Sequence, residues 1–414
     1  MPRRQGSTLL IALLVGTAAL AALVAFTGSL LFTEPRARTV AASGPQGVAR
    51  TPAAPAHSTG LWLATWAAAP VRGETDPEQA TDPHLRTIRN VVHTSIGGDA
   101  ARITLSNLFG THPLLIDRVT VSGLPVTFRG APSVTVAVGG RIVSDPVVVP
   151  VAADADLVVA LRTPTARGPV TVHPNSHQTS STEAPQGTRD TMDWRYLTAV
   201  DVRGGKAAGT LVAFGDSLTD GSGSTTDANS RWPDVLADRL AGRYAVVNQG
   251  IAGNRLLRDG TGPRALDRFE RDVLAVTGAK TVVIALGIND VQAFPQETDP
   301  ARITDALRTL TERAHTRGLR VIGATLMPYE GHRNWTPARN AVRTRVNEAI
   351  RAGGVFDQVL DFDRAARDPL RPDRLLPGYD VGDHLHLNDA GYQRLGTLAD
   401  VAGLLRTRPA SDAL

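Results

Sequence analysis

The chain has 414 residues, of which 42% are hydrophobic and 20% charged, so it can bury the cores of two folded domains. It contains no cysteine, which excludes disulfides, thiol catalysis and cysteine-ligated zinc. The formal net charge is +4, but the basic residues are scattered among acidic ones and no basic run carries interleaved aromatics. Composition therefore argues against nucleic-acid binding.

The first element in chain order is an uncharged apolar run over residues 9–32, which follows Arg3 and Arg4. Such a run is typical of an export signal, although it is longer than most signal peptides and long enough to span a bilayer. Residues 1–32 are thus either a cleaved signal peptide or a membrane anchor. Both alternatives predict a protein outside the cytoplasm, secreted or held at the outer face of the cytoplasmic membrane.

Two segments with different patterns follow. Residues 33–60 are rich in Pro, Ala and Gly without periodicity, which is typical of a linker. Residues 61–205 contain seven short β-branched runs separated by Gly, Pro and Asp, and no stretch with a helical period. The sequence therefore predicts an all-β sandwich, similar to a jelly roll, over residues 61–205.

The large polar and aromatic side chains of this β segment are expected to be structural. Three tryptophans are predicted to lie in its core rather than on a sugar-binding platform: Trp62, Trp66 and Trp194. His173 and His177 have the spacing of a metal-ligand pair, but the sequence offers them no nearby carboxylate partner. They and His93 are therefore predicted to be structural residues.

The pattern changes after residue 206, where apolar runs alternate with amphipathic stretches. The runs are suited to strands buried on both faces: residues 210–215, 244–250, 281–287, 319–326 and 356–363. The amphipathic stretches predict helices: residues 231–242, 264–276, 299–318, 337–354 and 388–407. This alternation predicts an α/β domain over residues 206–408, with a parallel five-stranded sheet in a flavodoxin-like three-layer α/β/α arrangement.

Residues suited to a role in catalysis follow several of these predicted strands. Ser217 comes directly after the first strand, in "GDSLTDG", where a serine by itself is most often a turn residue. The second and third strands end in "NQGIAGN" and "GIND", and "DHLHLNDAGY" follows the fifth. Since the carboxyl ends of parallel strands share one edge, a serine, a glycine, an asparagine and an Asp-x-x-His pair are expected to meet there. Ester hydrolysis needs such a set.

These four segments, in this order, resemble the conserved blocks of the SGNH hydrolases, also called GDSL esterases/lipases. The resemblance covers about residues 210–406. The preceding segment, which carries "LWLATWAAAP", "VVHTSIGG" and "RITLSNLFG", is similar to the subgroup in which a β-sandwich precedes the hydrolase domain. That subgroup implies an esterase acting on aryl esters or acetylated carbohydrate.

The resemblance also implies roles for single residues. Ser217 corresponds to the nucleophile, and Asp383 and His386 correspond to the rest of a catalytic triad. The Ser217 amide, Gly253 and Asn289 correspond to the oxyanion hole. The family needs no metal or cofactor. Leu387 departs from the family pattern, which usually has proline after the histidine.

Alternatives remain for these residues and for the whole chain. Gly253 is also typical of a tight turn, and Asn289 of a helix cap. Asp216 and Asp290 are expected to support loops through backbone hydrogen bonds. Other functions are a phosphate-binding loop, a lipase or lysophospholipase, or a non-catalytic carbohydrate-binding surface protein. No Gly-Lys-Ser/Thr ending supports the phosphate loop, and no apolar lid insertion is evident, so short acyl chains on a small molecule or polysaccharide are favoured.

Overall fold

The computed structural model describes residues 60–74, 87–164, 167–184 and 187–400. Contacts divide the chain into two compact units, residues 1–56 and 57–414, and every described residue lies in the second. The predicted signal peptide or anchor and nearly all of the predicted linker lie outside the described residues. Within the described part, the helices are too short or too polar to cross a membrane.

The first part of the described chain is built from antiparallel strands, as predicted. Their bounds are β1 (Leu63–Ala67), β2 (Val71–Arg72), β3 (Thr87–Thr94), β4 (Gly98–Ser106), β5 (Leu114–Ile116), β6 (Arg118–Val121), β7 (Leu124–Pro125), β8 (Val134–Val136), β9 (Arg141–Val143), β10 (Val147–Val151), β11 (Ala155–Arg162), β12 (Thr171–His173), β13 (Ser180–Ala184), β14 (Gly187–Thr191), β15 (Trp194–Arg195) and β16 (Leu197–Arg203). Five strands form one sheet, in the order β1-β16-β4-β10 with β9 paired to β4. Six form another, β14-β13-β3-β11-β6-β7, and two small sheets complete the region, β15-β12-β2 and β5-β8.

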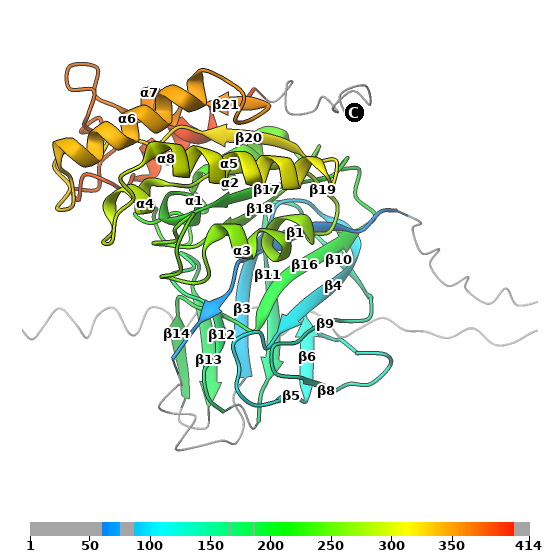
Figure 1. Cartoon of the computed structure of the whole chain (residues 1–414). Helices are drawn as coiled ribbons and strands as arrows, with labels where there is room; N and C mark the ends of the chain where they lie inside the picture. Colours follow the sequence, from blue (N-terminus) through cyan, green and yellow to red (C-terminus); the bar gives the residue numbers. More distant parts are fainter. Residues whose placement is uncertain (1–59, 75–86, 165–166, 185–186, 401–414) are drawn as a thin grey trace, which may run out of the picture. The chain divides into compact units, whose positions relative to one another are not determined.

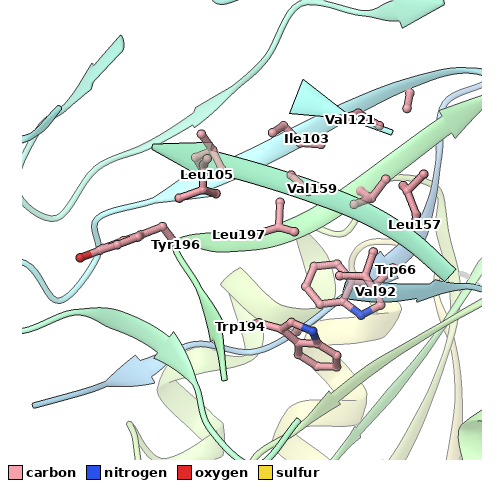
Figure 2. Packing of buried hydrophobic residues seen from close by; sticks show 14 of the residues in the cluster. Trp66, Val92, Ile103, Leu105, Val121, Leu157, Val159, Trp194, Tyr196 and Leu197 are labelled. Carbon is pink, nitrogen blue, oxygen red and sulfur yellow. The ribbon is translucent and has the colours of Figure 1, made fainter. Parts of the chain in front are cut away.

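Buried and more exposed side chains alternate along several of these strands. In β3, for example, every second residue is buried, including Ile88 and Val92. Figure 2 shows how side chains from several strands converge on one apolar cluster, which confirms the predicted sandwich.

The three tryptophans of this region differ in their surroundings. Trp66 and Trp194 are buried with their rings edge to face, 4.8 Å apart, as predicted. Trp62 is only half-buried, so its placement in the core is wrong. Its ring instead contacts the guanidinium groups of Arg102 and Arg203, 4.7 and 5.1 Å from the ring centre.

The second part has the predicted α/β pattern (Figure 1, green to red). Its elements are β17 (Thr210–Gly215), α1 (Ser217–Asp220), α2 (Trp232–Leu240), β18 (Ala245–Gly250), α3 (Ala265–Phe269), η2 (Glu270–Leu274), β19 (Ala279–Ala285), α4 (Ile288–Gln292), α5 (Pro300–His315), β20 (Arg320–Ala324), α6 (Pro337–Arg351), β21 (Gln358–Leu360), α7 (Phe362–Ala366) and α8 (Asp389–Gly396). All five strands are parallel, in the order β18-β17-β19-β20-β21. This is the flavodoxin-like order, whose carboxyl edge holds ligands.

Helices cover both faces of this sheet. On β17, Val212 and Phe214 join a core that includes residues of α3, α5 and α6. Leu211 and Ala213 alternate with them and join a second core with residues of α2, α7 and α8. Neighbouring residues of a strand point to opposite faces of the sheet, and helices cover both faces, so every residue of β17 is buried. The predicted three-layer arrangement is confirmed.

Two helices differ most from their predicted extents, and the other three lie up to three residues inside their predicted bounds. The stretch predicted as one helix over residues 264–276 divides, after the buried Phe269, into α3 and the π-helical turn η2. The helix predicted over residues 388–407 ends at Gly396, where glycine disfavours helix and where a Cβ atom would meet Val235 at 2.6 Å. Residues 401–407 of that prediction lie outside the described part.

The β region covers the edge strand of the parallel sheet. Ala245, the first residue of β18, and Ile251, the residue after its end, belong to the same apolar cluster as the sandwich core. The N–H of Val246 donates to Ser95 Oγ at 3.0 Å. The predicted boundary near residues 205 and 206 therefore falls between β16 and β17, within one compact unit.

Candidate active site

Ser217 lies where the first parallel strand turns into a short helix. β17 ends at Gly215, and a Cβ atom there would come within 2.0 Å of Thr219 Oγ1, so only glycine fits this close approach. Asp216 caps α1, because its Oδ1 accepts a hydrogen bond from Leu218 N at 3.1 Å. The turn places Ser217 at the carboxyl edge of the sheet with 6% of its surface exposed.

His386 and Asp383 come to this serine from the loop before α8. His386 Nε2 lies 2.8 Å from Ser217 Oγ, and His386 Nδ1 lies 2.6 Å from Asp383 Oδ2. A carboxylate accepts the Nδ1–H, which leaves Nε2 free to accept the serine proton. The structure thus brings together the three residues that the family resemblance implied.

The carboxylate of Asp383 also closes the turn that presents the histidine. Its Oδ1 accepts hydrogen bonds from the backbone N–H groups of Leu385 and His386, both at 2.9 Å. Partial burial raises the pKa of Asp383, but these bonds and the imidazole outweigh it and lower the pKa to about 2. Asp383 is therefore ionised at neutral pH and can stabilise an imidazolium.

His384, the neighbour of the proposed base, belongs to a different pair. Its Nδ1 lies 2.6 Å from Asp380 Oδ2, and Asp380 Oδ1 accepts the His384 N–H at 3.0 Å. Its φ of 64° turns the side chain away from its neighbours, and 42% of that side chain is exposed. As expected, His384 is a rim residue that does not contact Ser217.

Gly253 lies in the loop after β18 with a φ of 75°, a conformation that favours glycine. A Cβ atom there would also meet Thr261 Oγ1 at 3.0 Å. The turn interpretation of Gly253 is therefore correct, and it is compatible with the oxyanion role. Among the described residues, the N–H groups of Gly253 and Ser217 donate to no other protein atom, so both are free to bind a substrate oxygen.

Asn289 lies in α4, directly after β19. Its Nδ2 donates to Asn254 O at 3.0 Å, and its Oδ1 accepts from Gln292 Nε2 at 2.9 Å. Because the amide has two N–H groups, one remains for a ligand. The capping alternative is wrong, since Gly287 is the N-cap of α4. Asn289 is 5% exposed, so its orientation is fixed by these neighbours.

Two buried aspartates support the loops around the serine, as expected. Asp290 accepts the backbone N–H groups of Leu256 and Leu257 at 2.7 and 3.0 Å, which joins the third motif segment to the residues just after the second. Asp216 caps α1 in the first. Burial raises the pKa of Asp290, and it raises the pKa of Asp216 to about 7.

The sequence analysis did not predict a role for Arg268, whose side chain connects the ends of β17 and β18 with the loop after β18. Its guanidinium is fully buried and donates to Gly215 O at 2.8 Å, Gln249 O at 2.9 Å and Asn254 Oδ1 at 2.9 Å. Asp272, one helical turn away, is its buried counter-ion at 3.1 Å. Burial lowers the pKa of Arg268 to about 10. An arginine on the sheet-facing side of a predicted amphipathic helix was the available signal.

The expectation that His173 lacks a carboxylate partner is wrong. His173 Nε2 lies 3.0 Å from Asp220 Oδ1, 47 residues away, and only the fold brings the two together. His93 likewise contacts Asp154 and Asp156, each at 2.9 Å. Within the described ranges, no group of three or more His, Cys, Asp or Glu side chains is arranged to hold a metal ion.

Comparison with known protein families shows that residues 213–394 match the GDSL-like Lipase/Acylhydrolase family. Among solved structures, Est24, a carbohydrate acetylesterase from Sinorhizobium meliloti, is 18% identical; 47% of this chain and 99% of that chain are covered, with a TM-score of 0.40. The M. smegmatis aryl esterase is 21% identical, over 48% of this chain and 100% of that chain, with a TM-score of 0.40. The search of curated proteins gave no match.

Proposed function

We propose that the protein, whose residues 213–394 match the GDSL-like lipase/acylhydrolase family, is an exported serine esterase that hydrolyses short-acyl carboxylic esters. The observation that carries the proposal is the chain of contacts from Ser217 Oγ to His386 Nε2, at 2.8 Å, and from His386 Nδ1 to Asp383, at 2.6 Å. A serine in contact with a base, itself oriented by a carboxylate, is an activated nucleophile.

In the first half-reaction Ser217 Oγ attacks the ester carbonyl carbon while its proton passes to His386 Nε2. Asp383 stabilises the imidazolium that forms. The N–H groups of Ser217 and Gly253 and the free N–H of Asn289 receive the negative oxygen of the tetrahedral intermediate. The bond to the alcohol then breaks, and the alcohol leaves with the proton from His386.

The second half-reaction restores the serine. Water gives a proton to His386 Nε2 and attacks the acyl group on Ser217 through a second tetrahedral intermediate. The acid leaves as the proton returns to Ser217 Oγ. Every proton transfer in the cycle uses His386, so one base serves both halves.

Short acyl groups such as acetyl, on aryl or carbohydrate alcohols, are proposed as substrates in preference to long acyl chains. Two cavities, of about 280 and 80 Å³, are lined by other residues than Ser217 and His386, so neither is an acyl tunnel for this serine.

The test is hydrolysis of p-nitrophenyl acetate, butyrate and octanoate by the wild type and by Ser217→Ala. We expect the acetate to give the highest kcat/KM and the variant to lose turnover. Ser222→Ala, a substitution in the loop after α1, is the matched control and should keep turnover. Turnover that survives in Ser217→Ala would refute the serine mechanism.

Export is proposed from the apolar run at residues 9–32. The prediction is that the expressed protein is found in the culture medium or in the membrane fraction. Determination of the N-terminus by mass spectrometry then distinguishes cleavage from anchoring. A full-length chain in the cytosolic fraction would contradict export.

A further inference from the structure

A buried ion pair joins the β region to the helix that carries the serine. His173 is the last residue of β12, outside the residues that match the hydrolase family, and Asp220 is the last residue of α1. His173 Nε2 and Asp220 Oδ1 are 3.0 Å apart, and both side chains are 5% exposed. Such a pair is costly to bury unless each polar atom is satisfied.

The contacts of His173 determine its protonation. Its Nδ1 lies 2.9 Å from Ala69 O, which can only accept a hydrogen bond, so Nδ1 carries a proton. Its Nε2 faces a carboxylate oxygen, which also accepts, so Nε2 carries a proton as well. Trp194 stacks on the ring at 5.3 Å, a contact that favours a cation. Burial lowers the pKa of His173, but Asp220 outweighs it and the net pKa is raised.

The second oxygen of Asp220 reaches the proposed oxyanion hole. Asp220 Oδ2 accepts the backbone N–H of Ala252 at 3.0 Å, and Ala252 precedes Gly253. The backbone on this side is tightly packed, because a Cβ atom at Gly250 would come within 2.2 Å of Asp220 N. One carboxylate thus connects β12, the serine helix α1 and the loop that presents the Gly253 N–H.

We propose that His173 is a positioning residue for ester hydrolysis: as an imidazolium it holds Asp220, and through the Ala252 N–H it sets the direction of the Gly253 N–H. The inference rests on the proposed function, because it assigns its effect to the oxyanion hole. It also gives the β region a part in catalysis beside its packing role. Misdirected oxyanion donors lower the rate of the chemical step much more than the binding of substrate.

Another cation nearby does not replace His173. Arg231 is also buried, but its guanidinium is held by Asp234 at 2.6 and 3.0 Å. If the imidazole is removed, Asp220 Oδ1 is buried without its donor, so the carboxylate turns or shifts away from the Ala252 N–H. Either change loosens the loop that ends in Gly253.

The experiment compares His173→Leu with His173→Gln, whose amide can still donate to Asp220. The matched control is His315→Leu, because His315 and Asp357 form another His–Asp pair, at 3.0 Å, between the end of α5 and the residue before β21. For each variant kcat and KM are measured with p-nitrophenyl acetate, and the reactive serine is counted by stoichiometric labelling with a fluorophosphonate.

We expect His173→Leu to lower kcat per labelled serine about 10- to 100-fold with KM changed less than about threefold. His173→Gln should recover part of this loss, and His315→Leu should match the wild type. A boronic acid that forms a tetrahedral adduct on the serine should bind His173→Leu more weakly, in proportion to the loss of kcat/KM. A role limited to folding would lower the number of labelled serines and leave kcat per serine unchanged, which would overturn the inference.

Two of these variants distinguish a failure of this inference from a failure of the proposed function. If Ser217→Ala keeps turnover, the proposed function fails; if it is inactive while His173→Leu keeps kcat, only the inference fails. Should His173→Leu not fold, His173→Gln and Asp220→Asn carry the test. Unchanged kcat per labelled serine in both of these folded variants would overturn it.

Discussion

His386 Nε2 lies 2.8 Å from Ser217 Oγ although 169 residues separate the two in the chain. The serine follows the first strand of the parallel sheet, and the histidine follows the last. The sheet order puts β19 and β20 between β17 and β21, so the loop after β21 must return across the carboxyl edge to reach the serine. Leu387 is fully buried next to the histidine, and this burial anchors the returning loop where the family usually has proline.

The two histidines of "DHLH" should differ sharply in their effect on the rate. His386→Ala removes the base and is expected to lower kcat about 10⁴-fold, leaving only binding and the oxyanion hole. His384→Ala is expected to lower kcat less than tenfold, because His384 contacts Asp380 and not the serine. Both variants are measured on one small ester, with circular dichroism as the folding control. An inactive His384→Ala with an active His386→Ala would contradict the assignment.

Asp216 should make the protein less stable as the pH rises. Its folded pKa is raised to about 7 by burial, whereas an unfolded aspartate titrates near 4. Between these values the unfolded chain releases a proton that the folded chain retains, so the free energy of unfolding falls by up to about 4 kcal/mol from pH 4 to pH 7 and above. Asp216→Asn keeps an acceptor for Leu218 N and removes this slope.

The measurement is urea unfolding of wild type and Asp216→Asn from pH 5 to pH 8. We expect the variant to gain stability relative to the wild type with rising pH. A difference that is constant across this range would mean that Asp216 titrates alike in the folded and unfolded states.

Arg268 should be important for stability because its guanidinium has buried partners on four sides. Arg268→Met leaves Asp272 with Arg271 as its remaining partner and removes the buried donor to Gln249 O and Asn254 Oδ1, and it is expected to cost about 3 kcal/mol. The control is Arg264→Ala, which removes a pair with Asp267 at the surface and should change stability by less than about 0.5 kcal/mol. Equal unfolding midpoints for the two variants would refute this role.

A chelator should leave the esterase activity intact, because fixed hydrogen-bond donors are proposed to hold the oxyanion. The assay is p-nitrophenyl acetate hydrolysis before and after prolonged incubation with EDTA. Activity that is lost on chelation and restored by a divalent ion would assign the reaction to the metal-dependent class instead.

The sequence predicted the parts of the fold that depend on local pattern. β17 has the bounds predicted for it, since an apolar run between polar turns leaves little choice of register. The motif residues were predictable because each follows a strand, and parallel strands end at one edge. The roles assigned to Ser217, Asp383 and His386 came from the resemblance of whole motif segments, because spacing alone cannot show that the serine and the histidine meet.

The features that could not be predicted from the sequence depend on contacts between distant segments. The partner of His173 lies in another region of the fold, and the four partners of Arg268 come from β17, β18, the loop after it and η2. Neither set has a sequence period. The half-buried position of Trp62 likewise depends on two arginines from β4 and β16 that no local pattern pairs with it.

The covered edge of β18 has a consequence for any shortened form of the protein. A bare edge strand offers unpaired backbone groups to the edge of another molecule and promotes aggregation. Here Ser95 accepts the Val246 N–H, and apolar residues at both ends of β18 pack into the sandwich core. Expression of residues 206–414 alone would expose that edge, and these apolar side chains would lose their contacts with the sandwich core. Such a fragment is expected to form insoluble intermolecular sheets rather than a smaller soluble enzyme.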